Sequence, residues 1–258
     1  MALSPDVVAK LAEHLESAEL GARDVTKITD DYPQMDWQDA YAIRSRKLAR
    51  GQRLAGLKMG LTARAKMKQM GVDVPIFGFL MDYMARPDGG DIDMSQLIHP
   101  KIEAEIAFVT KAPLHGPGCH IGEVLAATDF VLPAVEIIDS RYRDFKFDLK
   151  SVVADNTSAA RFVIGGCARS AAELDLATLG VVLEKNGEIV ACAAAAAVLG
   201  HPANSVAMLA NMLAERGEHL PAGTFIMTGG VTEAITVSRG DSVHVRFQEL
   251  GSVSMRFV

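Results

Sequence analysis

The chain has 258 residues, of which 49% are hydrophobic and 22% are charged, and its formal net charge is −6. This composition is ordinary for a globular protein with a substantial core, and it includes no basic cluster that would favour nucleic acid or an anionic membrane. Three scattered cysteines, and the lack of an apolar stretch of transmembrane length, predict a protein of the reducing cytoplasm without a disulfide framework.

The N-terminal part of the chain is predicted to be helical. Helices are expected over residues 4–21, 36–51 and 62–71, with a short strand at 54–59 between the second and the third. Ser4 followed by Pro5 is a typical helix start, and Asp36 can cap the second helix by accepting a backbone N–H. Gly21 and Gly51 end these helices, because glycine adopts the conformation that helix C-termini favour.

From Pro75 onward the pattern changes to short strands and turns. The predicted elements are a hairpin over 181–190, a helix over 204–217, and final strands over 243–247 and 253–258. The hairpin is the clearest local signal, because Asn186 and Gly187 separate two apolar runs. Residues 75–78, Pro-Ile-Phe-Gly, are predicted to form a turn.

Two glutamates alternate with apolar residues in a predicted strand over 102–108. Because side chains alternate along a strand, Glu103 and Glu105 point from the same face, with Cα atoms roughly 6.5–7 Å apart. A third acid, Glu136, interrupts the apolar run over 130–138, where a lone charge is costly without a partner. Three carboxylates on apolar strands indicate an oxygen-lined site for a hard divalent cation, Mg²⁺ or Mn²⁺. The alternative is a solvated strand face beside an unrelated glutamate.

Four further polar residues have both a structural and a functional interpretation. Lys58 ends the predicted strand over 54–59, and is either a surface cation or a group that faces the acids. Ser158 is a turn hydroxyl or a donor to a ligand, and Asp155 is a turn former or an acid that supports the site. Arg141 is a solvated charge near a strand end or a partner for a ligand carboxylate.

Several stretches, in their order and spacing, resemble one enzyme family. They are Lys58-Met59-Gly60-Leu61-Thr62, the three acids, Val153-Ala154-Asp155-Asn156-Thr157-Ser158, residues 98–105, residues 138–142 and residues 223–230. Over essentially its whole length, the chain resembles the hydratase/decarboxylase branch of the fumarylacetoacetase-like superfamily. The resemblance implies an α+β fold in which a mixed β-roll over residues 75–258 carries the metal, and residues 1–74 form an N-terminal helical cap.

The resemblance also implies a lyase that converts 2-oxo-3-hexenedioate to 2-hydroxypenta-2,4-dienoate and CO₂ during the meta-cleavage degradation of aromatic compounds. The reaction would pass through a dienolate stabilised by Mg²⁺ or Mn²⁺, and Glu103, Glu105 and Glu136 would bind this metal. The resemblance implies Lys58 as the catalytic group. It implies Lys58, Ser158, Ile76 and Arg141 as contacts to the substrate, and Asp155 as an acid that supports these residues without touching the substrate.

Residue 76 bears on the type of reaction. Related hydratases have a Pro-Asp-Phe-Gly pattern whose aspartate helps to handle water, whereas this chain has Ile76 at that position. An apolar side chain cannot deprotonate water, so Ile76 favours decarboxylation over the main alternative, hydration of 2-hydroxypenta-2,4-dienoate. A C–C hydrolase and a catalytically inactive partner subunit are further alternatives. The family also implies a small-molecule substrate, a homo-oligomer and a complex with the pathway hydratase.

Overall fold

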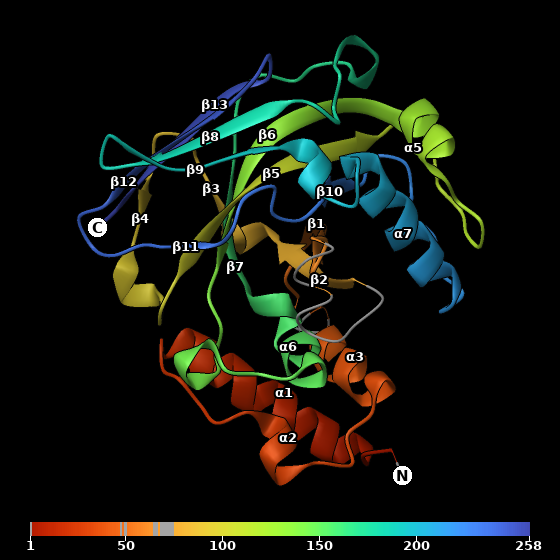
Figure 1. The fold of residues 1–258 in the computed structure, drawn as a ribbon. Helices are drawn as coiled ribbons and strands as arrows, with labels where there is room; N and C mark the ends of the chain where they lie inside the picture. The colour runs from red at the N-terminus through yellow and green to blue at the C-terminus, as the bar shows by residue number, and fades with distance from the viewer. Residues whose placement is uncertain (1, 47, 49–50, 64–66, 68–74) are drawn as a thin grey trace.

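The computed structural model of the chain describes residues 2–46, 48, 51–63, 67 and 75–258, and it consists of a helical part and a β-rich body (Figure 1). The α-helices that it describes are α1 (Pro5–Leu20), α2 (Ile28–Asp31), α3 (Trp37–Ser45), α5 (Ile121–Ala127), α6 (Leu149–Ala154) and α7 (Pro202–Ala214). None of these described helices combines the length and the apolar composition of a membrane span. The predicted order, helices first and strands after them, is confirmed, whereas the helix predicted over 62–71 lies mostly outside the described residues.

Eight strands form a larger mixed sheet, which curls across the β-rich body (Figure 1). The order of the sheet is β2-β1-β10-β5-β6-β7-β3, and β11 pairs with β5. These strands are β1 (Leu54–Gly60), β2 (Ile76–Met81), β3 (Ala85–Arg86), β5 (Lys101–Thr110), β6 (Thr128–Ile138), β7 (Ala159–Ile164), β10 (Phe225–Met227) and β11 (Ile235–Thr236). The long strands β5 and β6 pair antiparallel near the middle of the sheet, so the predicted strand over 102–108 is confirmed.

Five strands form a second sheet in the order β4-β13-β12-β8-β9. They are β4 (Asp91–Ile92), β8 (Gly180–Lys185), β9 (Glu188–Ala194), β12 (Ser242–Phe247) and β13 (Gly251–Phe257). The predicted hairpin and the two final strands are therefore confirmed. Asn186 and Gly187 connect β8 to β9, and both have positive φ, as an Asn-Gly hairpin turn requires.

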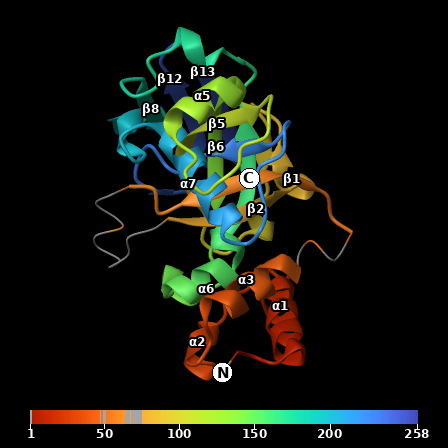
Figure 2. The ribbon, with the colours of Figure 1, turned by 90° about the vertical axis from the view of Figure 1, so that its right-hand side faces the viewer.

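The helices α1, α2 and α3 gather with α6 below the larger sheet, apart from α5 and α7 (Figures 1 and 2). Ser4 caps α1 and Asp36 caps α3, as predicted, although α3 ends at Ser45. Arg44 of α3 donates a hydrogen bond to the carbonyl oxygen of Phe77 in β2 at 2.7 Å. Its guanidinium also lies 4.3 Å from the centre of the Phe77 ring. The helical part is therefore attached directly to the edge strand of the larger sheet.

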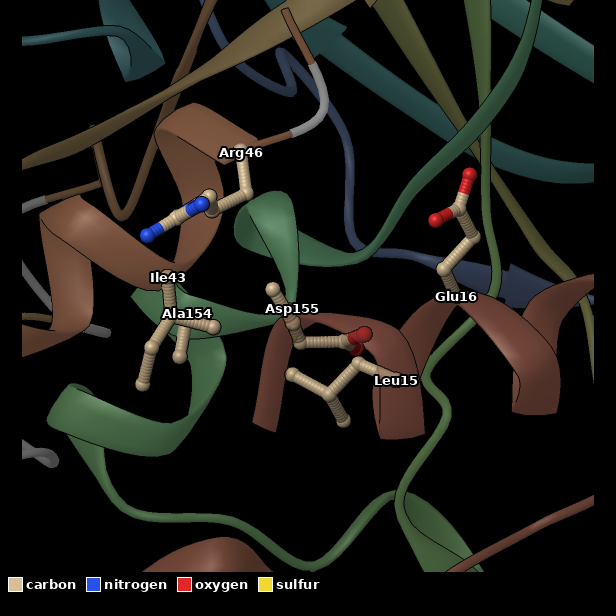
Figure 3. Close-up of a pocket in the computed structure, with 7 residues that line it drawn as sticks. Leu15, Glu16, Ile43, Arg46, Ala154 and Asp155 are labelled. Carbon is tan, nitrogen blue, oxygen red and sulfur yellow. The ribbon is translucent and has the colours of Figure 1, made fainter. Parts of the chain in front are cut away.

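A small cavity lies where α1, α3 and the end of α6 meet (Figure 3). Leu15, Ile43 and Ala154 are among the residues that line it, and its volume is about 10 Å³. A cavity of this size holds at most one water molecule. It is therefore a packing gap between the helices and too small for a substrate.

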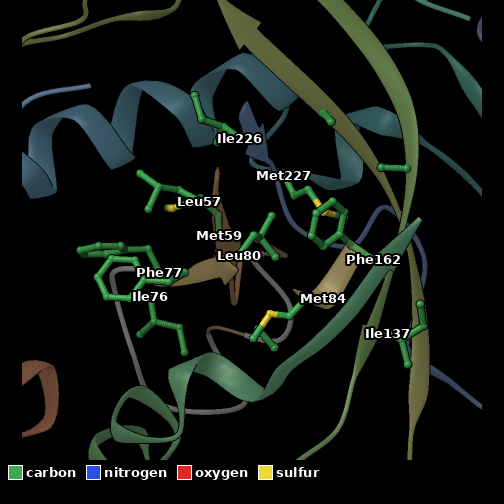
Figure 4. Packing of buried hydrophobic residues seen from close by; sticks show 14 of the residues in the cluster. Leu57, Met59, Ile76, Phe77, Leu80, Met84, Ile137, Phe162, Ile226 and Met227 are labelled. Carbon is green, nitrogen blue, oxygen red and sulfur yellow. The ribbon is translucent and has the colours of Figure 1, made fainter. Parts of the chain in front are cut away.

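Buried apolar side chains from β1, β2 and β10 pack together in the core of the larger sheet (Figure 4). They include Leu57, Met59, Phe77, Leu80, Ile226 and Met227. Full burial of one such side chain stabilises the fold by roughly 1.5–3 kcal/mol. Because Leu57 and Met59 are both buried, the backbone of β1 is fixed on either side of Lys58.

Two predictions of local structure are wrong. Residues 75–78 were predicted to form a turn, but Ile76 to Gly78 lie in β2 and pair with β1. Proline and glycine gave the turn signal, whereas Gly78 is needed for packing, because a Cβ there would lie 2.8 Å from the carbonyl oxygen of Asn156. The helix α7 begins at Pro202 and not at residue 204, because Nδ1 of His201 caps it by accepting the N–H of Ala203 at 3.0 Å.

The boundary between a cap and a roll at residue 75 stays a prediction. β1 lies before that position in the sequence, and it pairs with β2, which lies after it. β1 also pairs with β10 near the C-terminus. The strand that carries Lys58 is thus part of the larger sheet.

Candidate metal centre

Three glutamate side chains meet where β5 and β6 pair. Glu103 lies opposite Glu136 in the antiparallel register, and Glu105 follows on the same face of β5. One carboxylate oxygen from each residue lies within 4.8 Å of those from the other two. Glu105 and Glu136 are fully buried and Glu103 is half-buried. The structure therefore brings the three predicted acids together and excludes a solvated strand face.

Burial and mutual repulsion raise the pKa of the two buried acids. Burial raises the pKa of Glu136 to about 7, although the Lys58 ammonium opposes this change and Glu103 adds to it. Burial also raises the pKa of Glu105, and the neighbouring Glu136 carboxylate raises it further. Ionisation of these acids is unfavourable until a cation offsets their charge.

Lys58 projects from β1 into this cluster as a buried cation. Its Nζ lies 2.8 Å from Oε2 of Glu136, and it donates a hydrogen bond to the carbonyl oxygen of Thr157 at 3.1 Å. Burial alone would lower the pKa of Lys58, but the carboxylates of Glu136, Glu103 and Glu105 hold it above its ordinary value. Only 2% of the side chain is exposed, so the interpretation of Lys58 as a surface cation is wrong.

The donor atoms fit a hard divalent cation. Oε1 of Glu105 and Oε1 of Glu136 are buried and have no hydrogen-bond partner among the residues that the structure describes. Buried oxygens of this kind are costly in a folded protein unless an ion or water satisfies them. Three ionised carboxylates facing one ammonium leave two negative charges, which a dication neutralises. An all-carboxylate set suits Mg²⁺ or Mn²⁺.

A backbone amide that the sequence pattern did not single out orients the middle glutamate. The N–H of Gly229, just after β10, donates to Oε2 of Glu105 at 2.8 Å. Gly229 has a φ of 98°, and a Cβ at this position would overlap Oγ1 of Thr62, so only glycine fits here. The run Thr-Gly-Gly at 228–230 was the available signal, but it is too short to indicate a phosphate-binding loop.

The single 3-10 turn η5 (Asn156–Ser158) forms another wall of the site. Its three residues have φ values from 53° to 58°, a conformation that residues other than glycine rarely adopt. Asn156 fixes the turn, because its side chain accepts the N–H of Phe79 and donates to the Phe79 carbonyl oxygen, both at 2.8 Å. The turn thereby presents its central carbonyl oxygen to Lys58. It also buries Oγ of Ser158, which has no hydrogen-bond partner in the described part of the chain and is available to a ligand.

A pocket of about 420 Å³ lies beside Lys58 and Glu103. Its apolar wall consists of Leu61, Ile76, Ile138, Phe145, Phe147 and Val152 among others. Ser158 and Lys101 add polar groups to the wall, so the predicted contacts Ile76 and Ser158 both lie here. A second hollow of about 550 Å³ shares Lys101 and Glu103 with this pocket. The space next to the acids is large enough for a small organic ligand.

Arg141 and Asp155 pair with each other and do not line this pocket. Nε of Arg141 donates to Oδ1 of Asp155, Nη2 donates to the Asp155 carbonyl oxygen, and Nη1 donates to the Ala159 carbonyl oxygen at 3.2 Å. Arg141 is 1% exposed, so its interpretation as a solvated charge is wrong. The geometry does not support a contact from Arg141 to a substrate either. Asp155 ends α6 and anchors Arg141 directly before η5.

Known proteins resemble this chain over its whole length. Residues 59–258 match the fumarylacetoacetate (FAA) hydrolase C-terminal family. The chain is 66% identical to the 4-oxalocrotonate decarboxylase of Pseudomonas sp. (strain CF600), over 99% of this chain and 98% of that protein. It is 38% identical to the 2-oxo-hept-4-ene-1,7-dioate hydratase of Escherichia coli, over 96% of this chain and 97% of that protein.

A solved structure resembles both the helical part and the β-rich body. The 4-oxalocrotonate decarboxylase from Pseudomonas putida G7, complexed with magnesium and adipate, matches with a TM-score of 0.97 and 64% identity. The match covers 99% of each chain, so the α+β fold implied by the sequence is confirmed. On this evidence the chain belongs to the fumarylacetoacetate hydrolase family.

Proposed function

We propose that the chain is a metal-dependent carboxy-lyase that converts 2-oxo-3-hexenedioate (4-oxalocrotonate) to 2-hydroxypenta-2,4-dienoate and CO₂ in the meta-cleavage degradation of aromatic compounds. The observation that carries this proposal is the buried group of Glu103, Glu105, Glu136 and Lys58 beside a mostly apolar pocket. The identity of 66% to a 4-oxalocrotonate decarboxylase over the whole chain supports it.

Lys58 faces the place where negative charge develops during the reaction. The three glutamates would hold Mg²⁺, which supplies Lewis acidity toward the 2-oxo acid end of the substrate when it is bound. The bond between C5 and C6 breaks, C6 leaves as CO₂, and the electron pair spreads through the conjugated chain to the C2 oxygen. The Lys58 ammonium stabilises the charge on that oxygen. Its proton can then pass to the C2 oxygen and form the 2-hydroxy group of the product.

The wall of the pocket favours loss of CO₂ over addition of water. Ile76, Phe147 and Val152 line the pocket, and none of them can act as a base toward water. The apolar wall also helps to exclude water from the electron-rich intermediate, so that no water molecule is held in place to add to the dienoate. Oγ of Ser158 donates to the C1 carboxylate, at the end of the substrate that stays bound.

The alternative reaction, hydration of 2-hydroxypenta-2,4-dienoate, is tested by giving the purified chain each substrate with Mg²⁺. CO₂ release and dienoate absorbance are followed together. We expect CO₂ from the diacid and no enzymatic hydration of the dienoate. Hydration as fast as decarboxylation would replace the proposal with a hydratase. Metal binding without turnover of either substrate would indicate an inactive partner subunit.

Substitution of Ile76 tests the role of the pocket wall. Ile76 is 3% exposed and lines the pocket beside Lys58. Ile76→Asp should slow CO₂ release, because a buried carboxylate would repel the electron-rich intermediate. Ile76→Val keeps the wall apolar and is the matched control. Equal rates of CO₂ release from the two variants would show that residue 76 does not control the reaction.

We propose further that the chain acts in the cytoplasm as a homo-oligomer and associates with the pathway hydratase, which uses its product. The outer strand β9 supports an assembly, because it is the edge of the second sheet and carries exposed apolar side chains. Ile189 is 63% exposed and Val190 is 38% exposed. Light scattering of the chain, alone and mixed with the hydratase, tests both parts of this proposal.

A further inference from the structure

Lys101 is a second cation of the pocket, and no carboxylate in the described part of the chain pairs with it. Lys58, Arg141 and Lys146 each have a carboxylate oxygen within ion-pair distance. Lys101 begins β5, and its side chain lies on the strand face that carries Glu103. Its charge is therefore directed toward the metal site and is available to a ligand.

An aromatic side chain holds the Lys101 ammonium at the pocket wall. Nζ of Lys101 lies 4.4 Å from the centre of the Phe145 ring, which also packs against His99 with ring centres 5.0 Å apart. Phe145 and the preceding Asp144 have φ values of 58° and 56°. Two consecutive residues of this kind persist only where the surrounding structure holds them in place, and they are common at ligand sites.

We propose that Lys101 recognises the C6 carboxylate of the substrate, and thereby selects diacids over monoacids that have the same 2-oxo acid end. This inference rests on the proposed function. Lys101 and Glu103 both line the pocket and the second hollow, so a molecule bound at the acids has the ammonium within reach. Alternate residues of a strand have Cα atoms roughly 6.5–7 Å apart. The substrate extends beyond C2 and C6 through the oxygen atoms that these carbons carry, so it can reach from the acids to a side chain two residues along the same strand.

Other cations near the site are less suited to this role. Arg141 is saturated by Asp155 and by backbone carbonyl oxygens. Lys146 is 81% exposed and pairs with a neighbouring aspartate. Lys101 is half-buried and belongs to the rigid strand that also carries the acids.

The contact should contribute to substrate binding and little to the rate of the chemical step. A cation beside the departing carboxylate stabilises the substrate more than neutral CO₂, so a strong contact would oppose the reaction. The Phe145 ring shares the attraction of the Lys101 ammonium, which weakens its hold on the ligand. We therefore expect loss of Lys101 to raise KM and to leave kcat nearly unchanged.

Two ligands that differ only in the distal carboxylate test this inference. 2-Oxoadipate and 2-oxohexanoate share the 2-oxo acid end, and neither has the double bond that the reaction needs. Calorimetric titration into the Mg²⁺-loaded protein should give a Kd about tenfold lower for 2-oxoadipate, the scale of one charged hydrogen bond. Lys101→Met should raise that Kd about tenfold and change the Kd of 2-oxohexanoate less than about twofold. With 2-oxo-3-hexenedioate, the variant should raise KM and keep kcat within about threefold.

Two further variants control for charge and folding. Lys146→Met removes an equal charge from the pocket edge and should keep the preference for 2-oxoadipate. Lys101→Arg keeps the positive charge at residue 101 and should retain most of that preference. The inference is overturned if Lys101→Met keeps the preference for 2-oxoadipate, weakens the binding of both ligands equally, or lowers kcat at constant KM. It is also overturned if Lys146→Met abolishes the preference. The titrations need no turnover, so a wild type that prefers 2-oxoadipate but releases no CO₂ would contradict the proposed function alone.

Discussion

Lys58 remains charged although its side chain is buried. Desolvation disfavours an ammonium, but three carboxylates face this one and outweigh the effect of burial. Removal of one member of a buried ion pair typically costs roughly 3–5 kcal/mol, because the other charge stays behind. A bound dication would take over part of the role of Lys58 toward Glu136. Lys58 therefore contributes to the stability of the metal-free protein, and the proposed function gives the same residue a second role in the reaction.

Lys58→Met should lower kcat/KM for CO₂ release by at least about 10²-fold, the usual scale for loss of a charged group near developing negative charge. Mg²⁺ binding should persist, because the three glutamates remain. Kinetics and Mg²⁺ titration on the same preparation check both statements. Lys111→Met, at an exposed lysine just beyond the far end of β5, is the control and should match the wild type. A loss of less than about threefold would show that Lys58 is not catalytic.

At the scale of elements, strand register and one turn place the acids. The pairing of β5 with β6 sets Glu103 opposite Glu136, and a slip of one residue would turn Glu136 to the other face of the sheet. β10 pairs with β5 on its other side, so Gly229, two residues after the end of β10, reaches Glu105. Gly229 at this turn therefore links the backbone of one strand to the carboxylate of another.

Gly229→Ala should weaken Mg²⁺ binding by at least about tenfold, the usual scale for loss of a contact that orients a metal ligand. The added Cβ would overlap Thr62 and move the N–H away from Glu105. Gly223→Ala is the matched control, because Gly223 also has positive φ but has open space around its Cβ position. Each variant should lose about 1–2 kcal/mol of stability from the positive φ. Calorimetric Mg²⁺ titration distinguishes the loss of the Gly229 contact from the loss of stability that both variants share. Equal Mg²⁺ affinities of the two variants would contradict a role for the Gly229 amide.

The elements that could be predicted from the sequence are those whose residue pattern lies within a few neighbouring positions. The alternation at 102–108, the helix caps at Ser4 and Asp36, and the Asn186-Gly187 turn are all of this kind. The turn predicted at 75–78 is wrong because Gly78 serves close packing against a distant segment, which the local pattern cannot show.

The candidate site was predictable to a similar extent. The acids and Lys58 followed from local pattern and family resemblance, but the pairing of Glu103 with Glu136 depends on tertiary register. The turn η5 has a left-handed backbone conformation but contains no glycine, so its residue types did not indicate that conformation. Lys101 was missed because its importance depends on Phe145, which belongs to another segment of the chain.

For the whole molecule, metal binding, pH and stability are coupled through the buried acids. A carboxyl group whose pKa is higher in the folded protein than in the unfolded chain binds its proton more tightly when folded. Burial raises the pKa of Glu136 to about 7 and raises that of Glu105 as well. These groups therefore stabilise the metal-free fold at low pH, and that contribution is lost as pH rises from the unfolded pKa through the folded one.

Mg²⁺ should raise the thermal unfolding midpoint more at about pH 8 than at about pH 6, because it binds the ionised acids and must displace their protons at lower pH. Calorimetric scans with Mg²⁺ and with a chelator, at both pH values, measure this difference. Glu136→Gln should reduce the pH dependence of the metal-free protein, since the variant lacks the group with the raised pKa. Equal stabilisation by Mg²⁺ at the two pH values would contradict this coupling.

The most direct test of the three glutamates as the metal site of a decarboxylase is to titrate Mg²⁺ into metal-free protein while CO₂ release from 2-oxo-3-hexenedioate is followed. CO₂ release should be absent after chelation, should return in step with binding of about one Mg²⁺ per chain, and should match the dienoate formed. Glu105→Gln should need at least about 10²-fold more Mg²⁺, whereas Glu123→Gln, at an exposed glutamate of α5, should behave as the wild type. Full CO₂ release after chelation, or a normal Mg²⁺ requirement in Glu105→Gln, would contradict the assignment of the site.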